Sequence, residues 1–234
     1  MTYAATKRSQ TLQLEPPRFE NGKALLIAGL RGEYTPESVN GLPAQWQRLV
    51  PHLGKVPGQV GRATYGVSWC PENSLAISYL CGVEVCDFSS LPHEFTIVSI
   101  PAQRYAVFSH RGHVSRIRET IEAIGSKWFR ESGQEPAARA GEAPDFFERY
   151  TEQFDPRTGM GGMEIWIPVK SSGDLMSSGR SRLFANRAVR KVALRFERAR
   201  CPGAPHGARR VLPALRRHHQ SDESLRRARS KRSA

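Results

Sequence analysis

The stretch AGLRGEYT at residues 28–35 returns in altered form as FSHRGHVS at residues 108–115, 80 positions later. Each copy ends a stretch rich in branched residues, and each is followed by a segment of helical spacing and then by two more strand-like segments. A period of 80 is too long for a solenoid. The repetition therefore predicts an α+β protein with tandem duplicated β-α-β-β units around a pseudo-twofold axis, whose antiparallel sheets form a ligand cleft.

The two units can be followed segment by segment along the chain. In the first, KALLIAGLRG predicts a strand, residues 43–53 a helix, and ATYGVSW and LAISYLCGVEV two strands joined by a turn at CPENS. In the second, FTIVSIPAQRYAVFSHRG predicts strand material interrupted by Pro101, and VSRIRETIEAIGSKWF predicts a helix. The last two strands are predicted at DFFERYTEQFD and GGMEIWIPV. The glycine-rich TGMGGM does not lead from a strand into a helix, so it predicts a turn and not a phosphate loop.

The charge of the chain is unevenly distributed. The net charge is +13, and residues 171–234 hold 17 Lys and Arg against 4 Asp and Glu, which leaves the rest of the chain balanced. We therefore expect an N-terminal arm (1–13), a folded domain (14–170) and a basic, mostly disordered tail (171–234). The tail could contact nucleic acid non-specifically, with a short basic helix at 183–199, or it could be a reading-frame artefact.

Several features bear on the compartment. No run of 18 apolar residues exists, so no membrane span is expected, and the N-terminus lacks the apolar region of a secretory signal. The four cysteines show neither a CxxC motif nor the paired spacing of a metal site. These features predict a cytoplasmic protein with reduced thiols.

The segment DFFERY, residues 145–150, carries the question of function. In a strand, Phe146, Glu148 and Tyr150 would share one face, and Phe147 and Arg149 the other. One interpretation is an edge strand whose acid points to water. The other is a pocket that combines a negative charge with aromatic walls, which suits an apolar cation.

A set of segments in this order resembles a known family. They are LEPPRFE, the RG that ends the first strand of each unit, YGVSW, IPAQRYAVFSHRG, FFERY and IWIPVK. Together they resemble the GyrI-like small-molecule-binding domain, the effector-binding module of AraC-type and MerR-type regulators, which also occurs alone. The resemblance spans roughly residues 14–170. It implies the duplicated fold, a site for lipophilic and often cationic compounds between the units, and a buried pocket glutamate that here matches Glu148.

Other candidates follow from strand alternation and from the duplication. Tyr65 and Trp69 lie on one face of the strand that corresponds to DFFERY, so they could form the opposite wall of the pocket. The ligand-binding residues we predict are Glu148, Tyr150, Phe146, Tyr65, Trp69, Trp166 and Tyr34.

Several other residues are predicted to have structural roles. Trp46 and Trp128 are better read as core residues. Glu84 and Glu164 hold related positions in the two units, either as solvated strand acids or, for one of them, as a second pocket acid. His110 and His113 lack further ligands nearby, so we expect neither a metal nor a cofactor.

Three functions remain open from the sequence. The first is binding of a lipophilic, cationic small molecule, in drug or effector sensing or in sequestration. The second is hydrolysis of an electrophilic compound in the same pocket, with Glu148 as general acid or base and Tyr150 or Tyr65 as hydrogen-bond donor. The third is a protein or nucleic-acid interaction module that uses the tail. We expect binding and not catalysis, and a separate regulator protein as a possible partner, since the segment before residue 14 is too short for a helix-turn-helix domain.

Overall fold

The computed structural model describes residues 14–70, 76–137 and 143–171. Its strands are β1 (Arg18–Gly22), β2 (Leu25–Tyr34), β3 (Gln59–Trp69), β4 (Ile77–Val85), β5 (Thr96–Ile100), β6 (Gln103–His110), β7 (Phe146–Tyr150) and β8 (Met163–Pro168). Its α-helices are α1 (Leu42–Leu49), α2 (Ile117–Ala123) and the short α3 (Phe129–Ser132). The predicted N-terminal arm, most of the CPENS turn and, apart from its first residue, the basic tail lie outside the described residues.

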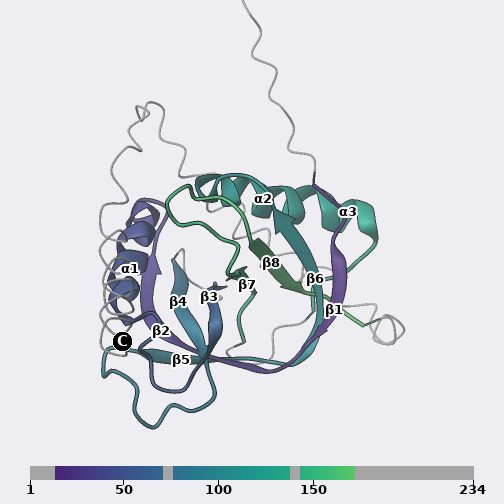
Figure 1. The fold of residues 1–234 in the computed structure, drawn as a ribbon. Coiled ribbons are helices and arrows are strands. Elements are labelled where there is room, and N and C mark those ends of the chain that lie inside the picture. Colours follow the sequence, from purple (N-terminus) through teal and green to yellow (C-terminus); the bar gives the residue numbers. More distant parts are fainter. Residues whose placement is uncertain (1–13, 71–75, 138–142, 172–234) are drawn as a thin grey trace, which may run out of the picture.

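The strands form one antiparallel sheet, which makes the protein an α+β protein (Figure 1). The strand order is β1-β6-β8-β7-β3-β4-β2-β5. The expectation of separate sheets is therefore wrong, because β3 and β7 pair with each other and join the two groups of strands into one surface. Since β7 has a partner on each side, the interpretation of DFFERY as an edge strand is also wrong.

The helices begin and end for local reasons. Pro43 lies in the first turn of α1, where a missing N–H costs nothing. The predicted helix at 43–53 is α-helical only to Leu49, and a 3-10 turn with Pro51 in it follows over Val50–His52. The second predicted helix runs through α2, a π-helical turn at Ile124–Trp128 and α3, and it ends at Gly133, whose φ of 68° is typical of a helix C-cap.

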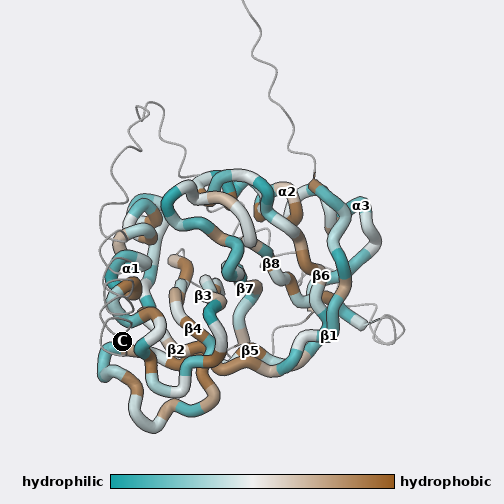
Figure 2. The backbone as a smooth tube through the Cα atoms, viewed as in Figure 1, coloured by the Kyte–Doolittle hydropathy of each residue, from teal (hydrophilic) through white to brown (hydrophobic). Residues whose placement is uncertain are grey.

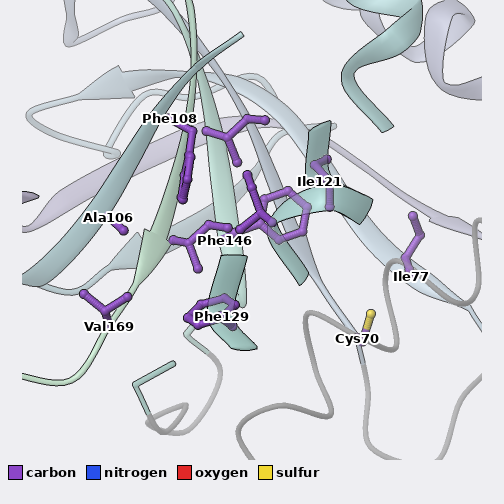
Figure 3. Close-up of a cluster of buried hydrophobic side chains, with 11 residues drawn as sticks. Cys70, Ile77, Ala106, Phe108, Ile121, Phe129, Phe146 and Val169 are labelled. Atoms are coloured by element: carbon purple, nitrogen blue, oxygen red, sulfur yellow. The ribbon is translucent and has the colours of Figure 1, made fainter. Parts of the chain in front are cut away.

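Both helices pack on the same face of the sheet, and hydrophobic side chains lie beneath each. Under α2, Phe108 and Phe146 from the sheet gather with Ile121 of α2 and Phe129 of α3 (Figure 3). Under α1, Leu30, Tyr79 and Cys81 from the sheet contact Leu49 and Trp46. In Figure 2, hydrophobic residues colour much of β4 and of the β2–β5 region. The two helices therefore flank the central strands on the face that carries Glu148.

The first strand was not predicted. Its sequence RFENG is short and mostly exposed, and it lies at the edge of the sheet beside β6. Among the described cysteines, Cys81 is a buried thiol and Cys86 an exposed one, and neither forms a disulfide. No helix in the described part of the chain is long and apolar enough to cross a membrane.

Candidate functional site

A single carboxylate lies buried in the middle of the sheet. As strand alternation predicts, Phe146, Glu148 and Tyr150 point to the helix-covered face of β7, and Glu148 is only 5% exposed. Its neighbour across the β3–β7 pair is Gly66. Because the glycine has no side chain, the space above it is open to groups from the next strand.

Two tyrosine hydroxyls donate to the same oxygen of Glu148. The distances to Oε2 are 2.9 Å from Tyr79, on β4, and 2.8 Å from Tyr150, on β7. No described residue donates to the other oxygen, Oε1, and no ion pair among the described residues includes Glu148. Among the described residues the carboxylate thus has hydrogen-bond donors on only one of its two oxygens and no cationic side chain beside it.

The proton affinity of this carboxylate is strongly perturbed. Burial raises the pKa of Glu148 to about 7, while the hydrogen bonds from Tyr150 and Tyr79 act in the opposite direction. The pKa values of Tyr79 and Tyr150 are raised well above their usual value, because both phenols are buried and lie beside Glu148. At neutral pH both phenols are therefore protonated, while Glu148 is near its pKa and is present in both its protonated and its ionised form.

Helix α1 supplies part of the wall around these groups. The indole Nε1 of Trp46 donates to the Tyr79 hydroxyl at 3.1 Å, and the Trp46 ring meets the Tyr150 ring edge-on at 5.1 Å between centroids. Phe154, in the loop after β7, also packs edge-on against the Tyr150 ring, with 5.0 Å between the ring centroids. The two rings therefore pack against Tyr150, whose hydroxyl is bonded to Glu148.

A buried glutamine fixes α1 to the sheet. The Nε2 of Gln45 donates to the carbonyl oxygens of Leu30 at 2.7 Å and Tyr79 at 3.2 Å, and its Oε1 accepts from the Tyr34 hydroxyl. A Cβ on Gly32 would lie 2.7 Å from that Oε1, so the glycine of the first RG is needed for this contact. The repeated sequence thus marks the position where α1 meets the sheet.

The sequence-predicted residues divide between the two faces of the sheet. Glu148, Tyr150, Phe146 and Tyr34 share the helix-covered face, with Phe146 in the cluster under α2 and Tyr34 bonded to Gln45. Tyr65, Trp69 and Trp166 lie on the opposite face, with Phe147. They cannot form a wall facing Glu148, because Tyr65 is paired with Arg149 and the residue opposite Glu148 is Gly66.

The opposite face has its own aromatic and ionic contacts. Phe147 and Trp166 stack at 5.4 Å, and the Tyr65 hydroxyl donates to Glu84 at 3.3 Å. Glu164 accepts from Arg18 at 2.8 Å and from the Trp166 indole at 2.9 Å. Neither Glu84 nor Glu164 is near Glu148. Both are paired strand acids.

His110 and His113 form hydrogen bonds in and around the turn that precedes α2. His110 Nδ1 lies 2.8 Å from the Thr120 hydroxyl, and its Nε2 lies 3.1 Å from the carbonyl oxygen of His113. Burial lowers the pKa of His110. Within the described ranges, no group of three or more His, Cys, Asp or Glu side chains could hold a metal ion.

Sequence reasoning missed Tyr79 and Gly66, which lie beside Glu148. It also missed three residues that contact the two tyrosines of the site, which are Trp46, Gln45 and Phe154. Gly66 carried a usable signal, because an isolated glycine inside a strand often marks a close approach of another group. Trp46 was predicted to be a core residue, and its partly buried ring does contact the core, but its N–H is bonded to Tyr79.

The fold and this site define a class of protein. Residues 15–170 match the family described as the GyrI-like small molecule binding domain, and the chain belongs to that family.

Particular relatives agree with this assignment. The chain is 30% identical over 129 residues to the transcriptional regulator BrlR of Pseudomonas aeruginosa. The aligned part makes up 53% of this chain and 44% of BrlR, so the chain spans less than half of the length of that regulator. Among solved structures, SAV2435 bound to tetraphenylphosphonium aligns with a TM-score of 0.54 and 20% identity over 70% of this chain and 98% of that one. EcmrR in its DNA complex aligns with a TM-score of 0.50 and 14% identity, over 70% and 61% of the two chains. At such identities the two structures show a common fold.

Proposed function

We propose that the protein binds lipophilic cations at Glu148. The observation that carries the proposal is a carboxylate 5% exposed, with a pKa raised to about 7 and no cationic side chain beside it among the described residues. A buried carboxylate is costly to keep ionised without a partner, and a ligand cation would be that partner. The family and the tetraphenylphosphonium held by SAV2435 support the same ligand class.

The surrounding rings supply the second element of recognition. Trp46 and Phe154 each pack edge-on against the Tyr150 ring, whose hydroxyl is bonded to the carboxylate. Each cation–π contact contributes about 0.5–2 kcal/mol, and a charged hydrogen bond roughly 1.5–3 kcal/mol. After the cost of ordering the ligand, these contributions suit dissociation constants in the micromolar range.

The similarity to BrlR and EcmrR supports a role in transcription regulation, as an effector-binding or drug-binding unit. Such a unit would act on a DNA-binding partner or domain. The described residues carry the buried carboxylate and its tyrosine partners, so we assign them the sensing role.

We also propose that the domain arose by duplication of a β-α-β-β unit. The order β7-β8-β6-β1 on one side of the β3–β7 pair is matched by β3-β4-β2-β5 on the other. Each side has one helix between its first and second long strands, α1 after β2 and α2 after β6. This arrangement fits a pseudo-twofold axis between β3 and β7, with the single acid Glu148 near it.

Titration of the full-length protein tests the proposed binding. Wild type and Glu148→Gln would be titrated by calorimetry with tetraphenylphosphonium and with its neutral isostere tetraphenylmethane, made soluble by a common polar substituent. We expect the cation to bind more tightly than the isostere, with the difference lost in Glu148→Gln. Equal binding of cation and isostere to both proteins would refute the proposal. Tyr65→Phe, on the opposite face, is the matched control and should behave as wild type.

A further inference from the structure

The two oxygens of the Glu148 carboxylate are not equivalent. Oε2 accepts from both Tyr79 and Tyr150, whereas no described residue donates to Oε1. An ionised carboxylate has about four acceptor positions, so the available acceptor capacity lies mainly on Oε1. This difference between the two oxygens adds a requirement to that of charge. A ligand would be bound at Oε1, and it would need a hydrogen-bond donor there.

The two hydroxyls are held in place. The Tyr79 oxygen already accepts from Trp46 Nε1, so its own proton is directed to Glu148. The Tyr150 ring lies between two edge-on contacts, with Trp46 at 5.1 Å and Phe154 at 5.0 Å. Both tyrosines are buried, and a swing of either hydroxyl to Oε1 would break these contacts.

We propose that the site selects cations that carry an N–H donor, such as protonated amines and amidinium groups, over fixed-charge cations of the same shape. This inference rests on the proposed function. In a protonated amine the N–H donates to Oε1, which completes the hydrogen bonding of the carboxylate. A quaternary ammonium or phosphonium ion is attracted by charge and by the aromatic rings, but it has no proton to donate.

The size of the preference follows from the strength of a charge-assisted hydrogen bond. Such a bond contributes enough to tighten binding about tenfold to hundredfold relative to a ligand that lacks it. Tetraphenylphosphonium belongs to the fixed-charge class, so we expect it to be a weaker ligand of this chain than a protonated amine of similar aromatic area.

A matched ligand pair tests the inference on the full-length protein. The pair is dimethyl(naphthylmethyl)amine, which is protonated at about pH 8, and its N-methyl quaternary salt, titrated by calorimetry above the pKa of Glu148. We expect the amine to bind wild type about tenfold to hundredfold more tightly than the quaternary salt. An equal or tighter affinity for the quaternary salt would overturn the inference.

Glu148→Gln provides a control with nearly the same shape. Tyr79 and Tyr150 both donate, so they would select the amide oxygen of the glutamine and leave its NH2 group at the position of Oε1. That NH2 group opposes an N–H donor, so the amine should lose more affinity than the quaternary salt. If both ligands bind wild type equally and both weaken in Glu148→Gln, the preference is wrong while the proposed cation site stands. If neither ligand responds to Glu148→Gln, both are wrong.

Tyr150→Phe gives a second variant that keeps the aromatic contacts. Removal of its hydroxyl opens acceptor capacity on Oε2, so the position of the ligand N–H is less strictly defined. We expect the pKa of Glu148 to rise. We also expect the ratio of the amine affinity to the quaternary-salt affinity to change by several-fold. A ratio that is unchanged while the pKa rises would show that the hydroxyls do not direct the ligand to Oε1, and the inference would fail.

Discussion

Gly66 lies directly opposite Glu148 in the β3–β7 pair, and its missing side chain makes room for the contact between Glu148 and the Tyr79 hydroxyl. A Cβ at this position would lie 2.1 Å from that hydroxyl and 2.5 Å from Oε2 of Glu148. The acid and the glycine are therefore one structural unit, although they are far apart in the sequence.

The first prediction concerns that glycine. Gly66→Ala should destabilise the protein by about 1–3 kcal/mol, because both ends of the Tyr79–Glu148 bond would have to move. Cation affinity should fall as well, and urea unfolding with calorimetric titration would measure both effects. Gly41→Ala is the matched control, since its Cβ would meet only Tyr34 at 3.3 Å, and we expect it to change stability by less than about 1 kcal/mol. Equal effects of the two substitutions would contradict the assignment.

The second prediction is a dependence of stability on pH. The pKa of Glu148 is about 7 in the folded state, against 4.5 as its ordinary value, so the folded state holds the proton more tightly. Its contribution is fully present below pH 4.5 and is lost as pH rises through about 7, a loss of about 3 kcal/mol.

The comparison that isolates this effect is wild type against Glu148→Gln. His110 acts in the opposite direction, because its lowered pKa costs stability as pH falls below 6.5. The difference in unfolding free energy between the two proteins removes the His110 contribution. We expect Glu148→Gln to be relatively more stable at pH 8 than at pH 5, as measured by urea unfolding. A difference in unfolding free energy that does not change with pH would show that folding does not raise the pKa of Glu148.

The third prediction concerns the two phenols. Tyr79→Phe should raise the pKa of Glu148 further, since a hydrogen bond that favours the charged form is lost. Cation binding should then begin at a higher pH than in wild type. Tyr65→Phe removes a phenol from the other face and should leave the pH profile of binding unchanged. Calorimetric titrations between pH 5 and 9 would distinguish the two variants. If their binding affinities depended on pH in the same way, Tyr79 would not be part of the site.

The fourth prediction uses tryptophan fluorescence. The Trp46 indole is bonded to Tyr79, which is bonded to Glu148, so its emission should change as Glu148 titrates near pH 7. Trp46→Phe should abolish this transition. Trp128→Phe should keep it, because Trp128 packs against Phe108 and Phe129 under the other helix. A transition that disappears only in Trp128→Phe would place the titrating group elsewhere.

Much of the fold could be predicted from the sequence. The strand positions and both helices follow from residue spacing, and alternation correctly places Phe146, Glu148 and Tyr150 on one face of β7. The strand β1 was missed, because its short polar sequence has no alternation and its partner β6 lies far along the chain.

The wall opposite Glu148 could not be predicted, for a physical reason. Alternation tells which residues of one strand share a face, but it does not tell which face they share with the residues of the neighbouring strand. The register decides this, and a shift by one residue exchanges the faces. Here the register pairs Glu148 with Gly66, so Tyr65 and Trp69 point away, while Tyr79 reaches the acid from one strand farther on.

The position of β7 in the middle of the sheet also determines the order of events during synthesis. Tyr79 leaves the ribosome 69 residues before Glu148, and Trp46 and Gly66 leave earlier still. Until Phe146–Tyr150 emerge, β3 has no partner on one side, and the N-terminal strand β1 waits for β6. β7 then pairs with β3 and delivers the carboxylate, and β8, which emerges last, pairs with β7 and β6 and completes the sheet, so a nascent chain cannot complete its architecture without also acquiring its acid.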